Sequence, residues 1–506
     1  MNIASALTEQ ARARPDAAAL ILVGGRRVTY RELDEDARRI ARGLGGIGIA
    51  PGTRTVLMVP PGPDFYPLMF GLFLAGAVPV VVDPGMGLKR MKASLAEAKP
   101  GAFVGIFKAH AARILFGLGG PTVRVKVGVG SCFGLGGLSL DEVRRRGGGG
   151  ATEAVATKDD DPAAILFTSG STGPPRGAVY THGNFAAQVE MVRRTFGIEP
   201  GEVDLPTFPL FALFDPALGM TTVVPDMDAA RPASADPAKI ARAIRDHSVT
   251  TMFASPGLLD PLSLWCEGHG VTFPSLRRVI SAGAPVSPRI VERMAKALPA
   301  TALLHTPYGA TEALPVATID HRAILGETAE KAAAGAGICV GRPVEGVEVR
   351  CIRVDDGAIP AWTPDLEVAR GTPGEICVRG PQVTRGYFAR PDADALAKIG
   401  DWHRMGDVGY IDEGGRLWFC GRMSQRVRTP EGDLYPDQQE AVLGVRSALV
   451  GIGPPGRARP IFVVEGDPGP GAGEFLRHPG PLPVDTRHNA KIQREKLARW
   501  AAERLK

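Results

Sequence analysis

The chain has 506 residues, of which 44% are hydrophobic and 22% are charged, as in an ordinary globular protein with two or three domains. Its formal net charge of +5 is small for this length and no dense lysine or arginine tract stands out, which argues against a nucleic-acid partner. The six cysteines are scattered with no C-x-x-C pair, which argues against a zinc site or a disulfide framework and favours a reducing, cytoplasmic setting.

Strands and helices are expected to alternate in the first part of the chain, which indicates an α/β architecture with a mainly parallel sheet. Thr29 and Glu32 have the spacing of a capping box, which predicts a helix that begins there and runs through Leu44. The other elements expected here are a helix at Ser5–Ala13, strands at Ala18–Leu22, Val56–Val59 and Val78–Val82, and a helix from Asp64.

The most apolar stretch of the chain is Phe65–Val82. Proline and glycine interrupt it at positions 67, 71, 76 and 79, so we expect a core helix followed by a buried strand and no integral membrane segment. The first residues, Met1–Asp16, lack the basic-then-apolar layout of a signal peptide. These features agree with the cytoplasmic location that the cysteines favour.

Glycine is frequent between about residues 116 and 150, and this region is expected to be a loop-rich excursion. From Pro162 onward the α/β alternation resumes. The elements expected there are helices at Asn184–Thr195 and Pro288–Leu298, and strands at Thr250–Ala254, Arg278–Ser281 and Ala302–His305.

The character of the chain changes at about residue 335. Short runs punctuated by glycine and proline, such as Val347–Val354 and Gly374–Arg379, predict a small β-rich subdomain. We therefore expect a large domain, 1–421, with the β-rich subdomain at about 335–421. A small α/β domain, 422–506, is expected to follow it after a hinge.

Thr168–Gly177 is the stretch most typical of a binding site. It follows an apolar run, Ala163–Phe167, that predicts a buried strand, and it holds four hydroxyl side chains and three glycines within ten residues. Glycines let backbone N–H groups point inward and hydroxyls add donors, so such a loop can enclose phosphate oxygens, with Arg176 as a fixed positive charge. The spacing does not fit a Walker P-loop, and a surface loop between strand and helix is the alternative.

Five stretches, in this order, resemble the adenylate-forming superfamily of acyl-CoA synthetases, peptide-synthetase adenylation domains and luciferases. They are Thr168–Gly177 (T-S-G-[ST]-T-G-x-P-[KR]-G), Tyr308–Glu312 (Y-G-x-T-E), Gly406-Asp407, Gly421-Arg422, and Lys491 within a run similar to G-K-[IL]-x-R. Each motif alone is weak, but five in order over most of the chain are a strong signal. The resemblance implies an α/β fold: a large N-terminal domain with two layered α/β subdomains and a small β-barrel-like subdomain, then a small mobile C-terminal α/β lid.

Two further runs, Pro206–Asp215 and Pro483–Lys491, resemble the olefin-biosynthesis β-lactone synthetase branch of that superfamily. Members of the branch adenylate a 2-alkyl-3-hydroxy fatty acid, and the hydroxyl of the substrate then closes a β-lactone and expels AMP. The resemblance implies the use of ATP and Mg²⁺ and a hydroxy fatty acid as the small-molecule substrate. A complex with other olefin-biosynthesis enzymes is the partner hypothesis that follows from it.

The resemblance also assigns roles residue by residue. Lys491 is expected to bridge the substrate carboxylate and the α-phosphate, Glu312 to bind Mg²⁺, and Asp407 to accept hydrogen bonds from the ribose hydroxyls. The catalytic residues are then Lys491, Glu312 and Thr168. The residues expected to bind ATP or AMP are Ser169, Gly170, Ser171, Thr172, Gly173, Arg176, Gly283, Ala284, Tyr308, Gly309, Thr311, Asp407 and Arg422.

Ordinary structural roles stay open for several of these residues. Lys491 could be a solvated lysine on a C-terminal helix, Asp407 a turn residue, and Arg422 half of a structural salt bridge. Tyr308 is expected to stack on adenine and Ser281–Pro285 to lie against the ring and the acyl chain, but the same string also occurs at an apolar strand end.

Several residues depart from the family pattern, and some of them bear on which group accepts the acyl group from the adenylate: a thiol or the hydroxyl of the substrate. Arg176 replaces the usual lysine and keeps the charge, and Ala212 stands where a histidine is common, so Ala212 and Phe211 are assigned to the substrate pocket alone. Glu431 occupies the glycine slot that borders the pantetheine tunnel in coenzyme A ligases, and a carboxylate there disfavours a thiol acceptor. His488 is a candidate base for the substrate hydroxyl, with a structural turn histidine as the alternative.

The leading hypothesis is therefore an ATP-dependent β-lactone synthetase that releases AMP. A long-chain acyl-CoA or acyl-carrier-protein ligase is the alternative within the same chemistry, and a non-catalytic nucleotide-binding scaffold is the alternative of another class. The presence of Glu312, Asp407 and Lys491 argues against the scaffold.

Overall fold

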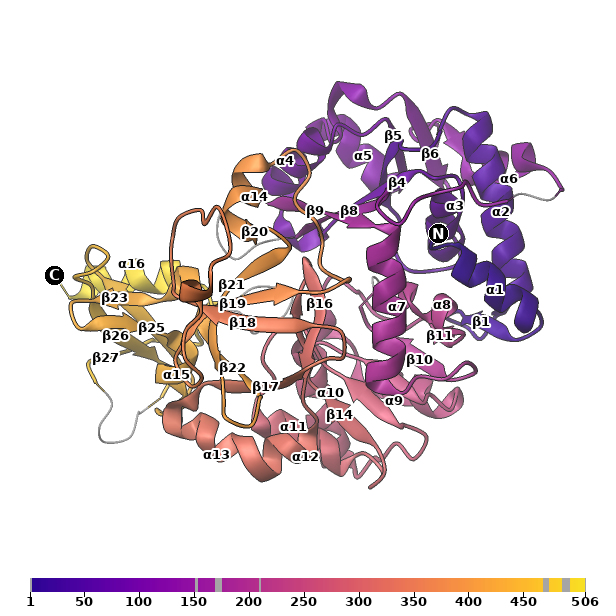
Figure 1. Cartoon of the computed structure of the whole chain (residues 1–506). Helices are drawn as coiled ribbons and strands as arrows, with labels where there is room; N and C mark the ends of the chain where they lie inside the picture. Colours follow the sequence, from indigo (N-terminus) through magenta and orange to yellow (C-terminus); the bar gives the residue numbers. More distant parts are fainter. Residues whose placement is uncertain are drawn as a thin grey trace. The chain divides into compact units, whose positions relative to one another are not determined.

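The computed structural model of the chain describes residues 2–150, 153–168, 175–208, 211–466, 473–484 and 492–505. The chain divides into two compact units, whose elements Figure 1 labels in sequence order. The first unit comprises Met1–Ala230, Lys239–Phe253 and Pro381–Asp394, and the second comprises Arg231–Ala238, Ala254–Gly380 and Ala395–Lys506.

The first unit contains a mostly parallel sheet of seven strands (Figure 1). Its neighbouring strands are parallel, with the exception of the last two in the order, which are antiparallel. The order is β7 (Leu138–Ser139), β6 (Val125–Val129), β5 (Ala102–Ile106), β3 (Arg54–Met58), β4 (Val78–Val82), β8 (Pro162–Thr168) and β9 (Arg176–Thr181).

Successive side chains of these strands point to opposite faces, and each face has its own apolar core. Leu57 and Val104 belong to one core, whereas Val56 and Phe103, each one position away, belong to the other. The helices that pack in the first core are α2 (Tyr30–Gly46), α3 (Phe65–Leu74) and α6 (Leu140–Gly147). Those that pack in the second core are α4 (Leu88–Ala98) and α5 (Phe107–Phe116).

A second sheet of the first unit brings together strands that are far apart in the sequence. Its strands in this unit lie in the order β12 (Thr251–Phe253), β10 (Val203–Pro206), β11 (Thr221–Val223), β1 (Ala18–Ile21) and β2 (Arg27–Thr29), and only β2 is antiparallel to its neighbour. The other helices of this part of the chain are α1 (Ser5–Ala13), α7 (His182–Phe196), α8 (Asp215–Leu218) and α9 (Pro237–Asp246).

The second unit begins with α/β elements and continues into an antiparallel sheet. The α/β elements are α10 (Pro256–His269), β13 (Arg278–Ile280), α11 (Pro288–Lys296) and β14 (Leu303–His305), with β13 and β14 parallel. The antiparallel sheet has the order β15 (Tyr308–Ala310), β16 (Ala313–Thr318), β17 (Ile338–Pro343), β22 (Leu417–Arg422), β21 (Trp402–Ile411), β19 (Gly374–Arg379) and β18 (Glu348–Ile352), and β20 (Lys398–Ile399) also pairs with β21.

A small sheet with its own core closes the second unit. Ala448, Val450, Ile461 and Val463 of its strands pack against Leu497 of the last helix. Its strands are β25 (Ser447–Ile452), β26 (Arg459–Val464) and β27 (Phe475–Arg477), and the helix is α16 (Arg494–Arg504). The hairpin of β23 (Val427–Thr429) and β24 (Gly432–Leu434) and the helix α15 (Pro436–Ala441) precede it.

Several predicted elements are confirmed. The helix Ser5–Ala13 and the strand Val78–Val82 have the predicted bounds. The capping box is present, because the Glu32 N–H donates to the Thr29 hydroxyl at 3.2 Å and the Thr29 N–H donates to the Glu32 carboxylate at 2.7 Å. All residues of α3 are buried and β4 follows it, as expected for a core helix and a buried strand.

The prediction of a loop-rich excursion at 116–150 is wrong in part. This region contains β6, β7 and α6, whose first turn is capped by the Ser139 hydroxyl. The glycines there serve close packing: a Cβ on Gly136 would lie 2.5 Å from the Cα of Gly128 in β6. Glycine that permits two backbones to approach cannot be told from glycine in a turn by composition alone.

In the described part of the chain, the structure contains no helix long and apolar enough to cross a membrane.

Candidate functional site

The predicted phosphate loop connects two strands that pair with each other. Thr168 ends β8 and is the register partner of Arg176, which begins β9. The loop therefore starts and ends at adjacent points of the sheet, at the carboxyl end of a parallel strand, where α/β sheets commonly bind ligands. Ser169, Gly170, Ser171, Thr172 and Gly173 lie outside the described residues, as does the side chain of Thr168.

Gly177 is required for packing at the base of this loop. A Cβ on Gly177 would lie 2.7 Å from Cζ of Phe167, the ring directly across the strand pair. Arg176 beside it is half-buried, and its guanidinium carbon lies 5.4 Å from the centre of the Tyr387 ring in the same unit. This cation–π contact holds the Arg176 charge at the end of the loop.

In the second unit, the structure brings together three residues that the sequence predicted. Asp407 in β21 and Arg422 at the end of β22 are register partners, and Arg422 Nη1 lies 3.0 Å from Asp407 Oδ1. The Tyr308 hydroxyl at the start of β15 donates to Asp407 Oδ2 at 2.6 Å. The Asp407 carboxylate thus lies between a cation and a phenol.

The Asp407 carboxylate contributes to raising the pKa of both its neighbours, Arg422 and Tyr308. Asp407 is only 3% exposed at its side chain, and its negative charge raises the pKa of Arg422. Burial, and then the charge of Asp407, hold the pKa of Tyr308 well above its ordinary value. An ionised carboxylate anchored in this way can accept further hydrogen bonds from a diol, as the ribose hypothesis requires.

Thr311 and Glu312 form the two-residue turn between β15 and β16, because Ala310 pairs with Ala313. Gly309 lies where a Cβ would be 2.8 Å from the Ala313 carbonyl oxygen, so this hairpin requires glycine. The charge of the half-buried Glu312 contributes to raising the pKa of Arg422. The predicted metal ligand is therefore close enough to the Asp407 cluster to act on it electrostatically.

Gly283 and Ala284 follow β13 in the same unit. Gly283 has φ +97°, a left-handed backbone conformation that favours glycine. Just before them, the Ser281 hydroxyl belongs to a residue only 1% exposed and has no hydrogen-bond partner among the described residues. A buried hydroxyl of this kind at the carboxyl end of a strand fits a polar group of a ligand.

Sequence reasoning missed a second charged cluster, formed by Asp437, Glu440 and Arg494. Arg494 Nη2 donates to Glu440 Oε2 at 2.9 Å, Nη1 contacts Oε1, and Glu440 Oε1 accepts from the Leu449 N–H at 2.7 Å. Burial, and then the charge of Glu440, raise the pKa of Asp437 to about 7. Arg494 is the last position of the lysine motif, and that was the available signal.

The Arg494 pair lies at the base of the predicted lysine loop. Val484 and Ile492 form an antiparallel bridge, and the Gln493 N–H donates to the Pro483 carbonyl at 2.8 Å. The chain segments on either side of 485–491 are therefore tied together. Lys491 and His488 lie outside the described residues.

The predicted substrate-pocket residues are placed only in part. Ala212 is 1% exposed and belongs to the apolar core of the first unit. The side chain of Phe211 lies outside what the structure describes. The assignment of both residues to an acyl pocket therefore stays a prediction.

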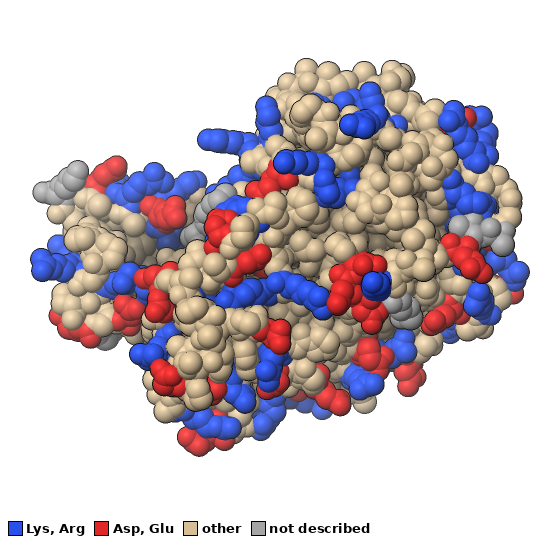
Figure 2. Space-filling model, turned by 45° about the horizontal axis from the view of Figure 1, so that its top comes forward, with Lys and Arg blue, Asp and Glu red and all other residues tan. Residues whose placement is uncertain are grey.

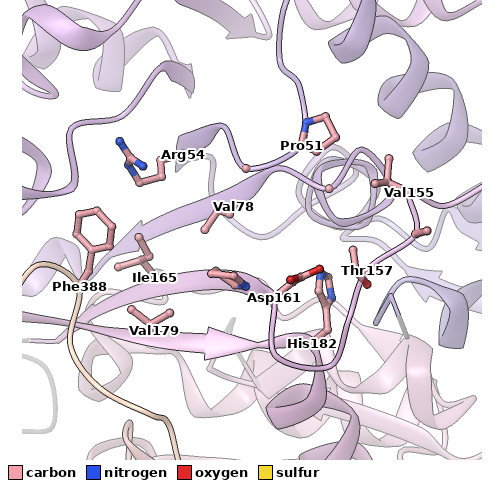
Figure 3. Close-up of a pocket in the computed structure, with 14 residues that line it drawn as sticks. Pro51, Arg54, Val78, Val155, Thr157, Asp161, Ile165, Val179, His182 and Phe388 are labelled. Atoms are coloured by element: carbon pink, nitrogen blue, oxygen red, sulfur yellow. The ribbon is translucent and has the colours of Figure 1, made fainter.

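A cavity of about 300 Å³ in the first unit is separate from the predicted residues. It lies at the amino ends of β3, β4 and β8, whereas the phosphate loop follows the carboxyl end of β8. Figure 3 shows His182 and Asp161 at one side of it and Arg54 and Phe388 at the other. Burial lowers the pKa of His182 to about 4, so this imidazole is neutral at pH 7.

Known enzymes are similar to this chain over most of its length. A family model described as AMP-binding enzyme matches residues 7–388. Olefin beta-lactone synthetases of Xanthomonas campestris and Stenotrophomonas maltophilia are 47% and 46% identical to the chain, over 99% and 100% of it and 98% of each relative. A feruloyl-CoA synthase of Amycolatopsis is 29% identical over 88% of the chain and 84% of the relative.

Solved structures show the same fold. The amide bond synthetase McbA of Marinactinospora thermotolerans superposes with a TM-score of 0.79 at 24% identity and covers 98% of this chain and 99% of its own. An O-succinylbenzoate coenzyme A synthetase of Bacillus subtilis, in complex with ATP and a magnesium ion, gives 0.76 at 20% identity, over 97% and 98%. The expected α/β fold of the adenylate-forming type, with a large N-terminal and a small C-terminal domain, is therefore confirmed.

Proposed function

Because the chain belongs to the family of AMP-binding enzymes, we propose that it adenylates a long-chain 2-alkyl-3-hydroxy fatty acid and closes it to a β-lactone, with release of pyrophosphate and AMP. The observation that carries this proposal is the identity of 46–47%, over nearly the full length, to two olefin beta-lactone synthetases. As a member of this family, the chain is an enzyme of the AMP-forming ligase type.

The first half-reaction joins two anions. A carboxylate oxygen of the acid bonds to the α-phosphorus of ATP, and the bond to the bridging oxygen breaks as pyrophosphate leaves. We assign Asp407, held by Tyr308 and Arg422, to the ribose hydroxyls, since a buried ionised carboxylate accepts both. Lys491 and the loop around Arg176 would offset the charge that builds up at the α-phosphate and on pyrophosphate.

Glu312 fits a magnesium site of the kind that relies on phosphate oxygens. The described residues contain no cluster of three or more His, Cys, Asp or Glu side chains that could enclose a metal ion. Mg²⁺ commonly binds through one or two carboxylates plus substrate phosphates, and Glu312 supplies one carboxylate at a turn. When bound, the ion would offset phosphate charge and orient the triphosphate.

In the second half-reaction, the 3-hydroxyl oxygen attacks the carbonyl carbon of the acyl adenylate. The bond from that carbon to the phosphate oxygen breaks, AMP leaves, and the hydroxyl proton passes to a base. We propose His488 as this base; a structural turn histidine is the alternative. If His488→Ala stops lactone formation but not adenylate formation, the base assignment holds.

Glu431 supports an internal acceptor over coenzyme A. Thr429 pairs with Gly432, so Glu431 lies in the turn between β23 and β24, where its side chain is exposed. Its N–H donates to the Thr429 hydroxyl at 3.2 Å. We infer that a carboxylate in the position that borders the pantetheine tunnel of coenzyme A ligases disfavours a thiol acceptor.

The experiment is an incubation with ATP and a 2-alkyl-3-hydroxy acid, with and without coenzyme A. The proposal predicts stoichiometric AMP and lactone without any thiol. Strict thiol dependence would favour the acyl-CoA or acyl-carrier-protein ligase, and failure of pyrophosphate exchange with every acid would favour the non-catalytic scaffold.

We further propose that residues 422–506 act as a mobile lid, and that the enzyme works in a complex with other olefin-biosynthesis enzymes.

A further inference from the structure

Positive charge is concentrated in one segment of the first unit. Residues 88–138 contain eight lysines and arginines but a single carboxylate, Glu97. The segment is therefore net +7, whereas the whole chain is +5, so the rest of the chain carries a net charge of −2. The segment comprises α4, α5, β5, β6 and the loops between them.

The cations of this segment face solvent. Six of the eight are exposed, and within the part of the chain that the structure describes none of these six lies within ion-pair distance of a carboxylate: they are Lys89, Arg90, Lys92, Lys99, Lys108 and Arg124. By comparison, Arg144, which follows the segment in sequence, forms ion pairs with Asp36 at 2.8 Å and with Asp64 at 2.7 Å. The charges of α4 and α5 are thus available to an external partner.

Apolar side chains are exposed beside these cations, since Lys92 Nζ lies 3.9 Å from where a Cβ on Gly117, directly after Phe116, would stand. Ile114, Leu115 and Phe116 form a continuous run at the end of α5, and they are 53%, 74% and 44% exposed. The opposite side of α5 packs into the core through Ala109 and Ala112. A run of three exposed large apolar residues is costly in water and marks a contact surface.

Phe133 is unusual in both its exposure and its backbone conformation. It is 83% exposed, and its φ of +46° is a left-handed conformation that a phenylalanine adopts only at a cost. Its ring meets that of Phe107 edge to face at 5.7 Å, and Arg113 Nη2 donates to the nearby Leu135 carbonyl at 3.3 Å. The fold therefore fixes Phe133 next to α5 although neither exposure nor backbone favours it.

We name these residues the α4–α5 face: Leu88, Lys89, Lys92, Phe107, Lys108, Ile114, Leu115, Phe116 and Phe133. In Figure 2, blue side chains lie around tan surface over the upper part of the molecule, where Figure 1 has α4 and α5. We propose that this face binds the surface of a lipid bilayer that contains anionic phospholipid.

The combination of cationic and apolar side chains on the α4–α5 face favours an anionic lipid bilayer as its partner. Lysine and arginine side chains are attracted to anionic headgroups, while phenylalanine and leucine side chains insert at the boundary with the acyl chains. A nucleic acid would use the cations but leave Ile114, Leu115 and Phe116 in water. The inference does not depend on which acid the enzyme adenylates, so it can fail while the proposed function holds.

Vesicle flotation tests the proposal with the full-length chain. We expect binding to vesicles of phosphatidylcholine mixed with an equal part of phosphatidylglycerol, weaker binding to phosphatidylcholine alone, and loss of binding at high salt. Lys92→Glu combined with Lys108→Glu should weaken partitioning about tenfold or more. Lys331→Glu combined with Arg370→Glu makes the same change of net charge at exposed positions elsewhere and should leave it unchanged.

Phe133→Asn removes the aromatic ring from the α4–α5 face without straining the backbone, because asparagine tolerates the left-handed conformation better than phenylalanine. We expect this variant to keep its melting temperature and its pyrophosphate exchange but to partition several-fold less onto the vesicles. Leu264→Asn, at a residue that is 50% exposed in the other unit, is the control and should bind as the wild type does.

Two results would overturn the proposal. The first is no binding to either vesicle. In that case, a concentration-dependent dimer or binding to duplex DNA that Phe133→Asn abolishes would assign the face to a second copy of the chain or to nucleic acid. The second is vesicle binding that both face variants leave intact.

Discussion

Asp407 and Arg422 face each other across β21 and β22, with Nη1 of Arg422 3.0 Å from Oδ1 of Asp407. Tyr308 approaches the same carboxylate from β15, so three strands position one charged acceptor. The antiparallel sheet thus fixes the group that we assign to ribose, independently of the loop that we assign to phosphate.

Asp407→Asn is expected to raise the KM for ATP by about tenfold to a hundredfold, because hydrogen bonds to a charged acceptor are replaced by weaker neutral ones. The measurement is the ATP dependence of pyrophosphate exchange. Asp401→Asn makes the same chemical change at an exposed residue just before β21 and should leave the KM unchanged. An unchanged KM in Asp407→Asn would refute the ribose assignment.

Glu440→Gln should lower kcat of adenylation about tenfold or more while the KM for ATP changes little. Arg494 is anchored by Glu440 three residues after Lys491, and a loosened anchor misplaces a group that acts in the transition state. Rapid-quench measurement of the adenylate gives the rate. The exposed neighbour Glu495, changed to Gln, is the control, and equal rates in both variants would contradict the anchoring role.

Gly177→Ala should destabilise the first unit by about 1–3 kcal/mol, because its Cβ would lie 2.7 Å from Cζ of Phe167. Thermal unfolding measures the loss. Adding Phe167→Leu should restore part of it, since the smaller side chain vacates the space. Gly268→Ala, at a helix position with nothing within 4 Å, should cost no stability. If the double variant were no better than Gly177→Ala, the cause would not be this contact.

His182 gives the fold a defined pH dependence. Its pKa is about 4 in the folded state and about 6.5 in an unfolded chain, because burial disfavours the charged imidazole. Its contribution to stability is therefore complete above about pH 6.5 and is lost as pH falls to about 4, by at most about 3 kcal/mol.

His182→Asn tests this assignment. Asparagine offers an acceptor near the position of Nδ1, which accepts the Ile3 N–H at 3.2 Å, and it does not titrate. The variant should lose part of the slope of unfolding free energy between pH 6.5 and 4, measured by urea unfolding at several pH values. His305, whose pKa burial also lowers to about 4, should retain its own share. An identical slope in wild type and variant would exclude His182 as the cause.

The sequence predicted Asp407, Arg422 and Tyr308 as site residues because each belongs to a short motif. It did not predict the contact of the Tyr308 hydroxyl with Asp407. It did not predict the Glu440–Arg494 pair, whose partners are 54 positions apart and follow no local period. It predicted no basic surface either. The cations of residues 88–138 are spread over helices, strands and loops, and only tertiary packing shows that they are exposed together.

The prediction of a loop-rich excursion at 116–150 was wrong in part for a related reason. Gly128 lies in β6 and Gly136 packs closely against it, a contact between segments that local composition cannot reveal. By contrast, the bounds of Ser5–Ala13 and Val78–Val82 were predictable from the local sequence.

In the reaction that we propose, the hydroxyl of the substrate attacks an acyl adenylate. A substrate with ¹⁸O in both carboxylate oxygens, incubated with ATP and no thiol, tests it directly by mass spectrometry of both products. We expect one ¹⁸O in AMP and one in the lactone, whose ring oxygen comes from the unlabelled hydroxyl. Unlabelled AMP together with a lactone that retains both labels would contradict it, because the carboxylate would then have been the nucleophile.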